Sequence, residues 1–129
     1  MNDSVAHVDD LRRACTDFRD ARDWKQFHNP KEVALCLSIE AAEILELFRF
    51  KSEDAVALDM KDETRRDLLS QEMADVLYWL LMLSDHTGID LASALERKLR
   101  INEQKYPVRL ARGRNLKYTE LAAEEASLG

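Results

Sequence analysis

The chain has 129 residues, the size of one domain, and 46% of them are hydrophobic, which is enough for a core. A net charge of -6 argues against general nucleic-acid binding, which requires a basic face, and two cysteines are too few for a disulfide framework. The polar start argues against a signal peptide, and the apolar run 76–83 is far shorter than the roughly 20 residues that span a bilayer. We therefore expect a cytoplasmic protein with no membrane and no nucleic-acid partner.

The first half of the chain carries the pattern of two helices. Apolar residues at three- to four-residue spacing predict a charged helix over about residues 5–22. The stretch RDWKQFHNP interrupts it, and Asn29 and Pro30 suit the N-cap and first position of a second helix, which should run to about Phe50. A polar link with about one helical turn is expected next.

The second half predicts two further helices and a tail. A third helix is expected over about 61–86, with Gly88 as its stop, and a fourth over about 90–105, capped by its first residue and ended by Pro107. Residues 107–129 lack a long apolar pattern and are expected to form an extended C-terminal tail. No strand is needed, so we predict an all-α four-helix bundle that forms one domain.

Four carboxylates fall on the apolar sides of two of these helices. At 100° per residue, Glu40 and Glu43 lie in the apolar sector of the second helix, and Glu72 and Asp75 lie in that of the third. Glu46 points to a different side of the second helix. Acidic side chains are almost never fully buried unless they are paired, and four together also repel one another. A divalent cation would offset both costs.

The spacing of the acids supports a cation site. Side chains three residues apart are neighbours on a helix, so Glu-x-x-Glu and Glu-x-x-Asp pairs on facing helices would bring four carboxylates to one point. Oxygen ligands alone suit Mg²⁺, Mn²⁺ or Ca²⁺ better than zinc, and the absence of a Glu-x-x-His pair argues against a di-iron centre. The alternative is that the acids simply face solvent, as most single Glu-x-x-Glu pairs do.

The fourth helix presents two polar residues on its apolar stripe. Lys98 could place a positive charge against a phosphate beside the metal, and Asn102 could hydrogen-bond a base or sugar. For Lys98 alone, the alternative is a stem that packs on the core while the ammonium group stays in water.

Aromatic residues near the acids could enclose a flat base. The loop before the second helix contains Trp24, Phe27 and His28, while Phe50 and Trp79 lie near the acids in the sequence. Ordinary core packing is the alternative for each of them, and it is the preferred interpretation for Phe27.

Longer stretches of the chain resemble a known family. The Glu-x-x-Glu and Glu-x-x-Asp pairs resemble those of the MazG-like nucleotide pyrophosphohydrolases. The stretches RDWKQFHNPKEVALCLSIEAAEILELFRF, QEMADVLYWL and KLRINEQKYPVRLARGRNLKYTEL are similar to the dCTP pyrophosphatase branch of that superfamily. The similarity covers nearly all of the chain after about residue 10. It implies an all-α enzyme that hydrolyses a deoxynucleoside triphosphate between the α and β phosphates, with Mg²⁺ as cofactor and Mn²⁺ as the alternative.

The resemblance also implies roles for individual residues. The metal ligands would be Glu40, Glu43, Glu72 and Asp75, the phosphate contact Lys98, the substrate-contacting amide Asn102, and the nucleoside pocket Trp24, His28, Phe50 and Trp79. The four acids and Lys98 would be the catalytic residues. Phe50 and Trp79 stand where mammalian-type members have tryptophan and tyrosine, which leaves the choice among dCTP, modified dCTP and other pyrimidines open. The sequence does not separate the acids as general base, and we take Glu43 as the candidate.

The third helix bears on assembly. Residues 76–83 are apolar on all sides, and such a helix is usually buried all round, which a small bundle cannot easily achieve. We therefore expect a homo-oligomer, and the resemblance implies a tetramer built as a dimer of dimers with sites between subunits. Two alternatives remain open: a nucleotide-binding module that has lost turnover, and a structural bundle whose acids pair with Lys98 and arginines of other subunits.

Overall fold

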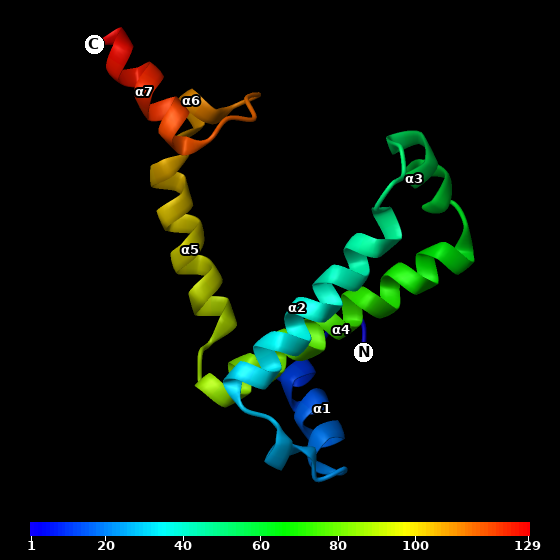
Figure 1. The fold of residues 1–129 in the computed structure, drawn as a ribbon. Helices are drawn as coiled ribbons and strands as arrows, with labels where there is room; N and C mark the ends of the chain where they lie inside the picture. Colours follow the sequence, from blue (N-terminus) through cyan, green and yellow to red (C-terminus); the bar gives the residue numbers. More distant parts are fainter. The chain divides into compact units, whose positions relative to one another are not determined.

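The computed structural model describes residues 1–129, and every regular element in it is helical (Figure 1). The elements in chain order are α1 (Val8–Asp20), the 3₁₀ segment η1 (Trp24–Phe27), α2 (Pro30–Phe48), α3 (Glu53–Asp59), α4 (Glu63–Thr87), α5 (Leu91–Lys105), α6 (Val108–Ala111) and α7 (Tyr118–Leu128). The predicted all-α class is confirmed, and the four expected long helices correspond to α1, α2, α4 and α5. None of the helices combines the length and apolar character that crossing a membrane requires.

The chain divides into two compact units, residues 1–89 and 90–129. In the first unit α2 and α4 lie side by side in opposite directions, joined through α3, and α1 packs against α4 (Figure 1). Val33 of α2 and Leu81 and Met82 of α4 are fully buried in this unit. The antiparallel pair places the middle of α2 beside the middle of α4, where the two acidic motifs occur.

Capping explains where the two long helices begin and end. The side chain of Asn29 accepts a 3.0 Å hydrogen bond from the Glu32 amide at the start of α2, as the sequence predicts. Asp62 accepts a 2.8 Å hydrogen bond from the Arg65 amide, so α4 begins two residues after the predicted position. Gly88 adopts the left-handed conformation (φ 68°) that ends α4, which confirms the predicted stop.

A buried arginine ties α1 to the end of α4. Arg19 is 1% exposed; its Nη1 donates to Asp85 Oδ2 at 2.7 Å and its Nε donates to Asp20 Oδ1 at 2.7 Å. The hydrogen bond from Arg19 holds the pKa of the Asp20 carboxyl below its usual value. The apolar pattern of the sequence places only hydrophobic residues of this helix in the core, so it does not identify this contact.

The second unit contains α5 and the C-terminal residues. Leu121 of α7 is fully buried, and ion pairs join Arg109 to Glu125 and Arg114 to Glu124. The segment expected to be an extended tail thus contains α6 and α7. A local cap favours α7, because the Lys117 amide donates a 2.8 Å hydrogen bond to Glu120. That the whole chain forms one domain remains a prediction.

The apolar segment of α4 is not enclosed within the single chain. Leu81 and Met82 are fully buried, but Leu77 is 42% exposed and Leu80 is 37% exposed. One chain therefore leaves part of this apolar segment uncovered, as expected for a small bundle, and burial on every side would require other subunits.

Candidate functional site

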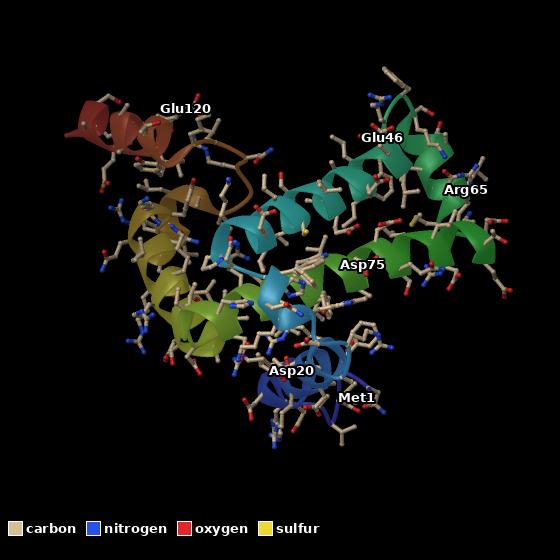
Figure 2. All side chains as sticks on the ribbon, turned by 60° about the horizontal axis from the view of Figure 1, so that its bottom comes forward. Met1, Asp20, Glu46, Arg65, Asp75 and Glu120 are labelled. Atoms are coloured by element: carbon tan, nitrogen blue, oxygen red, sulfur yellow. The ribbon has the colours of Figure 1, made fainter.

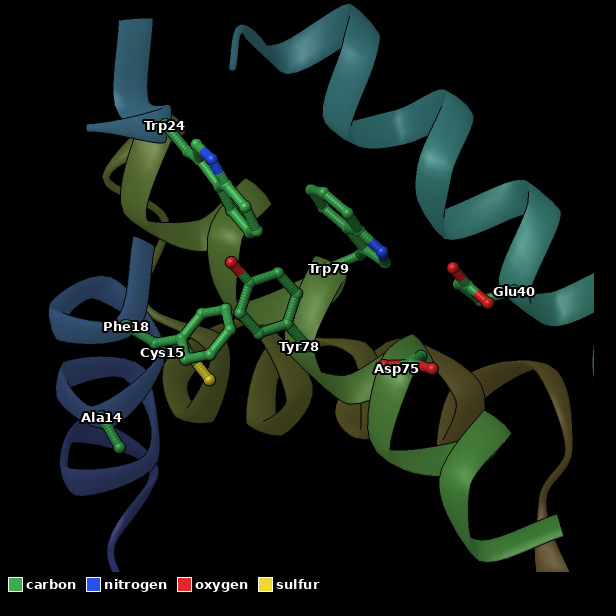
Figure 3. Close-up of a pocket in the computed structure, with 8 residues that line it drawn as sticks. All are labelled: Ala14, Cys15, Phe18, Trp24, Glu40, Asp75, Tyr78 and Trp79. Atoms are coloured by element: carbon green, nitrogen blue, oxygen red, sulfur yellow. The ribbon is translucent and has the colours of Figure 1, made fainter. Parts of the chain in front are cut away.

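Three carboxylates meet between α2 and α4. Glu40, Glu72 and Asp75 each have a carboxylate oxygen that lies within 4.8 Å of such an oxygen on the other two residues. Glu40 and Glu72 are half-buried and Asp75 is exposed. Figure 3 shows Glu40 and Asp75 directed toward each other from the two helices. The predicted convergence of acids is present for these three, although they lie in an open groove rather than in a sealed core.

The cluster is electrostatically unfavourable in the absence of a cation. Desolvation raises the pKa of Glu72, and the charges of Glu40, Glu43 and Asp75 raise it further. None of these four acids belongs to an ion pair of the chain. Within one chain, therefore, no cation of the protein balances their charge, and the alternative of ion pairs with other subunits stays open.

The donor set fits a hard divalent cation. Oxygens that share one Mg²⁺ at about 2.1 Å can be at most about 4.2 Å apart, so a spread of 4.8 Å requires only small side-chain rotations. Glu43 is exposed and outside the group of three, yet its charge acts on Glu72. Glu46 lies near Arg49, with 3.3 Å between its Oε2 and the arginine Nε, and takes no part in the cluster.

One cavity joins the acids to a group of aromatic rings. Its volume is about 470 Å³, and Glu40 and Asp75 contribute to its wall (Figure 3). The rest of the wall is largely aromatic, formed by Phe18, Trp24, Tyr78 and Trp79. A volume of this size is within the usual range for small-molecule sites.

Edge-to-face contacts hold the aromatic wall together. The ring of Phe18 lies 5.9 Å from that of Trp24 and 6.2 Å from that of Tyr78, and Tyr78 lies 5.0 Å from Trp79. Trp24 and Trp79 were predicted site residues, whereas the sequence analysis missed Phe18 and Tyr78. Tyr78 follows Asp75 by three residues and so lies on the same helix face, a signal that could have identified it.

His28 lies behind this wall rather than in it. Its ring is 5.3 Å from that of Trp79 and 6.3 Å from that of His86, and it does not line the cavity. Burial lowers the pKa of His28, and the charges of His86 and Arg19 lower it further. His28 is therefore neutral at pH 7 and supports the Trp79 side chain.

We expect His28 to make the protein acid-sensitive. The pKa of His28 is 6.5 in the unfolded chain and lower in the folded protein. Above pH 6.5 the side chain is mainly neutral in both states, so it does not make stability depend on pH. Below that pH the unfolded chain binds the proton more readily, so the free energy of unfolding falls. The melting temperature of wild type should fall between pH 7.5 and 5.5 more steeply than that of His28→Gln. His7→Gln, which alters an exposed histidine, should keep the wild-type slope. Equal slopes for wild type and His28→Gln would contradict this prediction.

Three other predicted residues do not line the cavity. Phe50 is 93% exposed, has a positive φ of 63°, and follows the end of α2, which is about 12 Å along the helix from Glu40. Lys98 is exposed and Asn102 is half-buried on α5, in the second unit. The cavity of the first unit is formed without them, and their roles stay predictions.

Removing one charge from the cluster should stabilise the metal-free protein. Because like charges and desolvation disfavour ionised Glu72, Glu72→Gln should raise the melting temperature at pH 7.5 in the presence of a chelator. Added Mg²⁺ should raise the melting temperature of wild type and have a smaller effect on the variant. Glu46→Gln, outside the cluster, should respond to Mg²⁺ as wild type does. Destabilisation by Glu72→Gln in chelator would show that this carboxylate has a partner in the fold.

Comparisons with known proteins cover most of the chain. Residues 35–121 match the model of the MazG-like family. The chain is 39% identical to dCTP pyrophosphatase 1 of Mus musculus and 38% identical to that of Homo sapiens, each over 114 residues that cover 88% of this chain and 67% of the relative. A pyrophosphatase from Archaeoglobus fulgidus has a similar structure, with a TM-score of 0.73, 38% identity, and coverage of 83% of this chain and 98% of that one. The family match includes both acidic motifs.

Proposed function

The chain belongs to the MazG-like family, and from this we propose that it is a nucleoside triphosphate pyrophosphohydrolase. In this reaction water hydrolyses the bond between the α and β phosphates of a deoxynucleoside triphosphate. The products are the monophosphate and pyrophosphate. The observation that carries the proposal is a single cavity in which a cluster of unpaired carboxylates adjoins an aromatic wall. The similarity to two mammalian dCTP pyrophosphatases favours dCTP or a 5-modified dCTP as the substrate.

The acidic part of the cavity would hold the cofactor. Glu40, Glu43, Glu72 and Asp75 are the proposed ligands of Mg²⁺, with Mn²⁺ as the alternative, since hard oxygen donors suit both ions. The ion would orient the phosphates, offset their charge and lower the pKa of a bound water. The role of α2 and α4 is to hold the carboxylates in place before the substrate arrives.

Glu43 is the proposed general base. Its carboxylate is exposed and is not one of the three that gather closely, so at least one oxygen remains available. A carboxylate beside the attacking water can accept its proton as the bond to phosphorus forms. The charge of Glu43 acts on Glu72, and this supports a position of Glu43 near the cluster.

The aromatic part of the cavity would receive the base. Trp24 and Trp79 offer flat faces, and a stacked base contributes about 1–3 kcal/mol of binding in comparable sites. His28 would act by supporting Trp79 from behind, since it contacts that ring and does not line the cavity.

A homo-oligomer would complete this site. We propose a tetramer built as a dimer of dimers, because Met73 and Leu77 of α4 remain 56% and 42% exposed in one chain. Phe50, Lys98 and Asn102 would then approach the substrate from elements that do not line the cavity of the first unit. Light scattering coupled to gel filtration measures the assembly directly, and a monomer at micromolar concentration would contradict this part of the proposal.

The test of the function is a substrate panel. The purified protein is incubated with Mg²⁺ and each of the four dNTPs, 5-methyl-dCTP and 5-halogenated dCTP, and the products are resolved by chromatography. We expect equal amounts of monophosphate and pyrophosphate, fastest with dCTP or a modified dCTP. Release of orthophosphate would indicate a different bond, and a nucleotide-dependent rise in melting temperature without products would indicate a binding module.

A further inference from the structure

The hydroxyl group of Tyr78 is buried and has no hydrogen-bond partner. Leaving such a group unpaired destabilises a protein, so folded proteins rarely retain one without a reason. Tyr78 is on α4 and forms part of the wall of the cavity described above. Because the hydroxyl is covered in the ligand-free protein, a group in the cavity could supply the missing partner once a neighbouring ring moves aside.

The surroundings of Tyr78 fix where its hydroxyl points. Edge-to-face contacts with Phe18 at 6.2 Å and with Trp79 at 5.0 Å hold the ring from two sides. In Figure 3 the hydroxyl points toward the side chain of Trp24, one of the two residues proposed to stack on the base. The unpaired oxygen thus lies among the aromatic rings that line the cavity and is separate from the carboxylates of Glu40 and Asp75.

The chemistry of the wall makes Tyr78 distinctive. Phe18 has no polar side-chain atom, and an indole N–H can only donate a hydrogen bond, whereas a phenol can both donate and accept. Desolvation raises the pKa of Tyr78, so its hydroxyl remains protonated at neutral pH. Within the aromatic wall, Tyr78 is the side chain that can accept a hydrogen bond from an exocyclic amino group or donate one to a ring carbonyl.

We propose that the Tyr78 hydroxyl hydrogen-bonds the edge of the nucleobase and is a specificity-determining group of this enzyme. This inference rests on the proposed function and adds a residue that reads the base rather than the phosphates. Because the hydroxyl lacks a partner in the ligand-free protein, it carries a stability cost that binding of the base removes. A site built to pair with a polar group of its substrate discriminates strongly against analogues that lack it.

Tyr78→Phe tests the proposal, because it removes one oxygen and keeps the ring. With the best substrate of the panel, we expect kcat/KM to fall about ten- to hundredfold, mainly through KM. Inhibition by inorganic tripolyphosphate, which has no base, should be unchanged. The melting temperature of the ligand-free variant should rise by about 2–5 °C, because an unpaired buried hydroxyl is gone.

The control is Tyr118→Phe in the second unit, which should change none of these quantities. A variant Tyr78→Phe with wild-type kcat/KM and wild-type base preference would overturn the assignment while leaving the proposed function intact. A lower melting temperature of this variant would overturn it as well, because the hydroxyl would then have a partner within the fold. Absence of turnover by wild type with every nucleotide would instead overturn the proposed function, and this assignment with it.

Discussion

Glu40→Gln and Asp75→Asn should each reduce pyrophosphate release by about 10³-fold or more, which corresponds to about 4 kcal/mol of lost transition-state stabilisation. Both side chains belong to the carboxylate cluster and to the cavity wall. An amide keeps the size of the carboxylate but carries no charge, so the variant binds a divalent cation weakly. Initial rates at saturating dNTP over a range of Mg²⁺ concentrations provide the measurement, and part of the loss should be recovered at high Mg²⁺.

The matched control for these variants is Glu46→Gln. Glu46 is on the same helix as Glu40 but lies near Arg49, so its loss should change the rate less than twofold. Gel filtration and circular dichroism should show that all three variants remain folded. Wild-type rates for either Glu40→Gln or Asp75→Asn would show that the catalytic assignment of the acids is wrong.

Helical spacing predicted three of the four acids that were expected to converge, because each acidic pair is local in sequence, and Glu43 lies outside the group of three. Residues three apart on α2 and on α4 must share a face, and two long antiparallel helices with apolar faces must pack together. Spacing alone does not show how open the groove is. Asp75 is exposed although it lies on the apolar side of α4, because α1 and α2, the main neighbours of this helix, do not cover it.

The aromatic wall was predicted only in part because its residues come from three segments. Phe18 is on α1, Trp24 on η1, and Tyr78 and Trp79 on α4. The sequence shows that each ring belongs to an apolar or aromatic stretch, but the choice between core and cavity depends on the packing of those segments. The roles of Lys98 and Asn102 rest on their place in the apolar stripe of their helix and on the family resemblance, because neither residue lines the cavity of the first unit.

The buried arginine could not be predicted, because its partner is 66 residues away in the sequence. Apolar periodicity favours hydrophobic residues for the core, and an arginine is normally placed on the surface. Arg19 can be buried because its guanidinium donates 2.7 Å hydrogen bonds to Asp20 and to Asp85, the latter at the end of α4. This contact holds α1 against α4 and so holds Phe18, the next residue toward the N-terminus, in the cavity wall.

Replacement of that arginine should therefore have the largest effect on stability. We expect Arg19→Met to reduce the free energy of unfolding by about 2–4 kcal/mol. Breaking a buried ion pair usually costs about 3–5 kcal/mol, and Asp85, with a side chain 30% exposed, regains some hydration. Urea denaturation gives this quantity, and Arg13→Met, which removes an exposed pair with Asp9, should change it by less than about 0.5 kcal/mol.

A double-mutant cycle separates the pair from the packing of the side chain. If the loss in Arg19→Met comes from stranding the Asp85 charge, then Arg19→Met combined with Asp85→Asn should be more stable than the sum of the two single changes predicts. Strict additivity would mean that Arg19 stabilises the protein by filling space between α1 and α4. In either case α1 is loosened, so KM for the nucleotide should rise in Arg19→Met, because Phe18 and Cys15 of α1 line the cavity that receives the base.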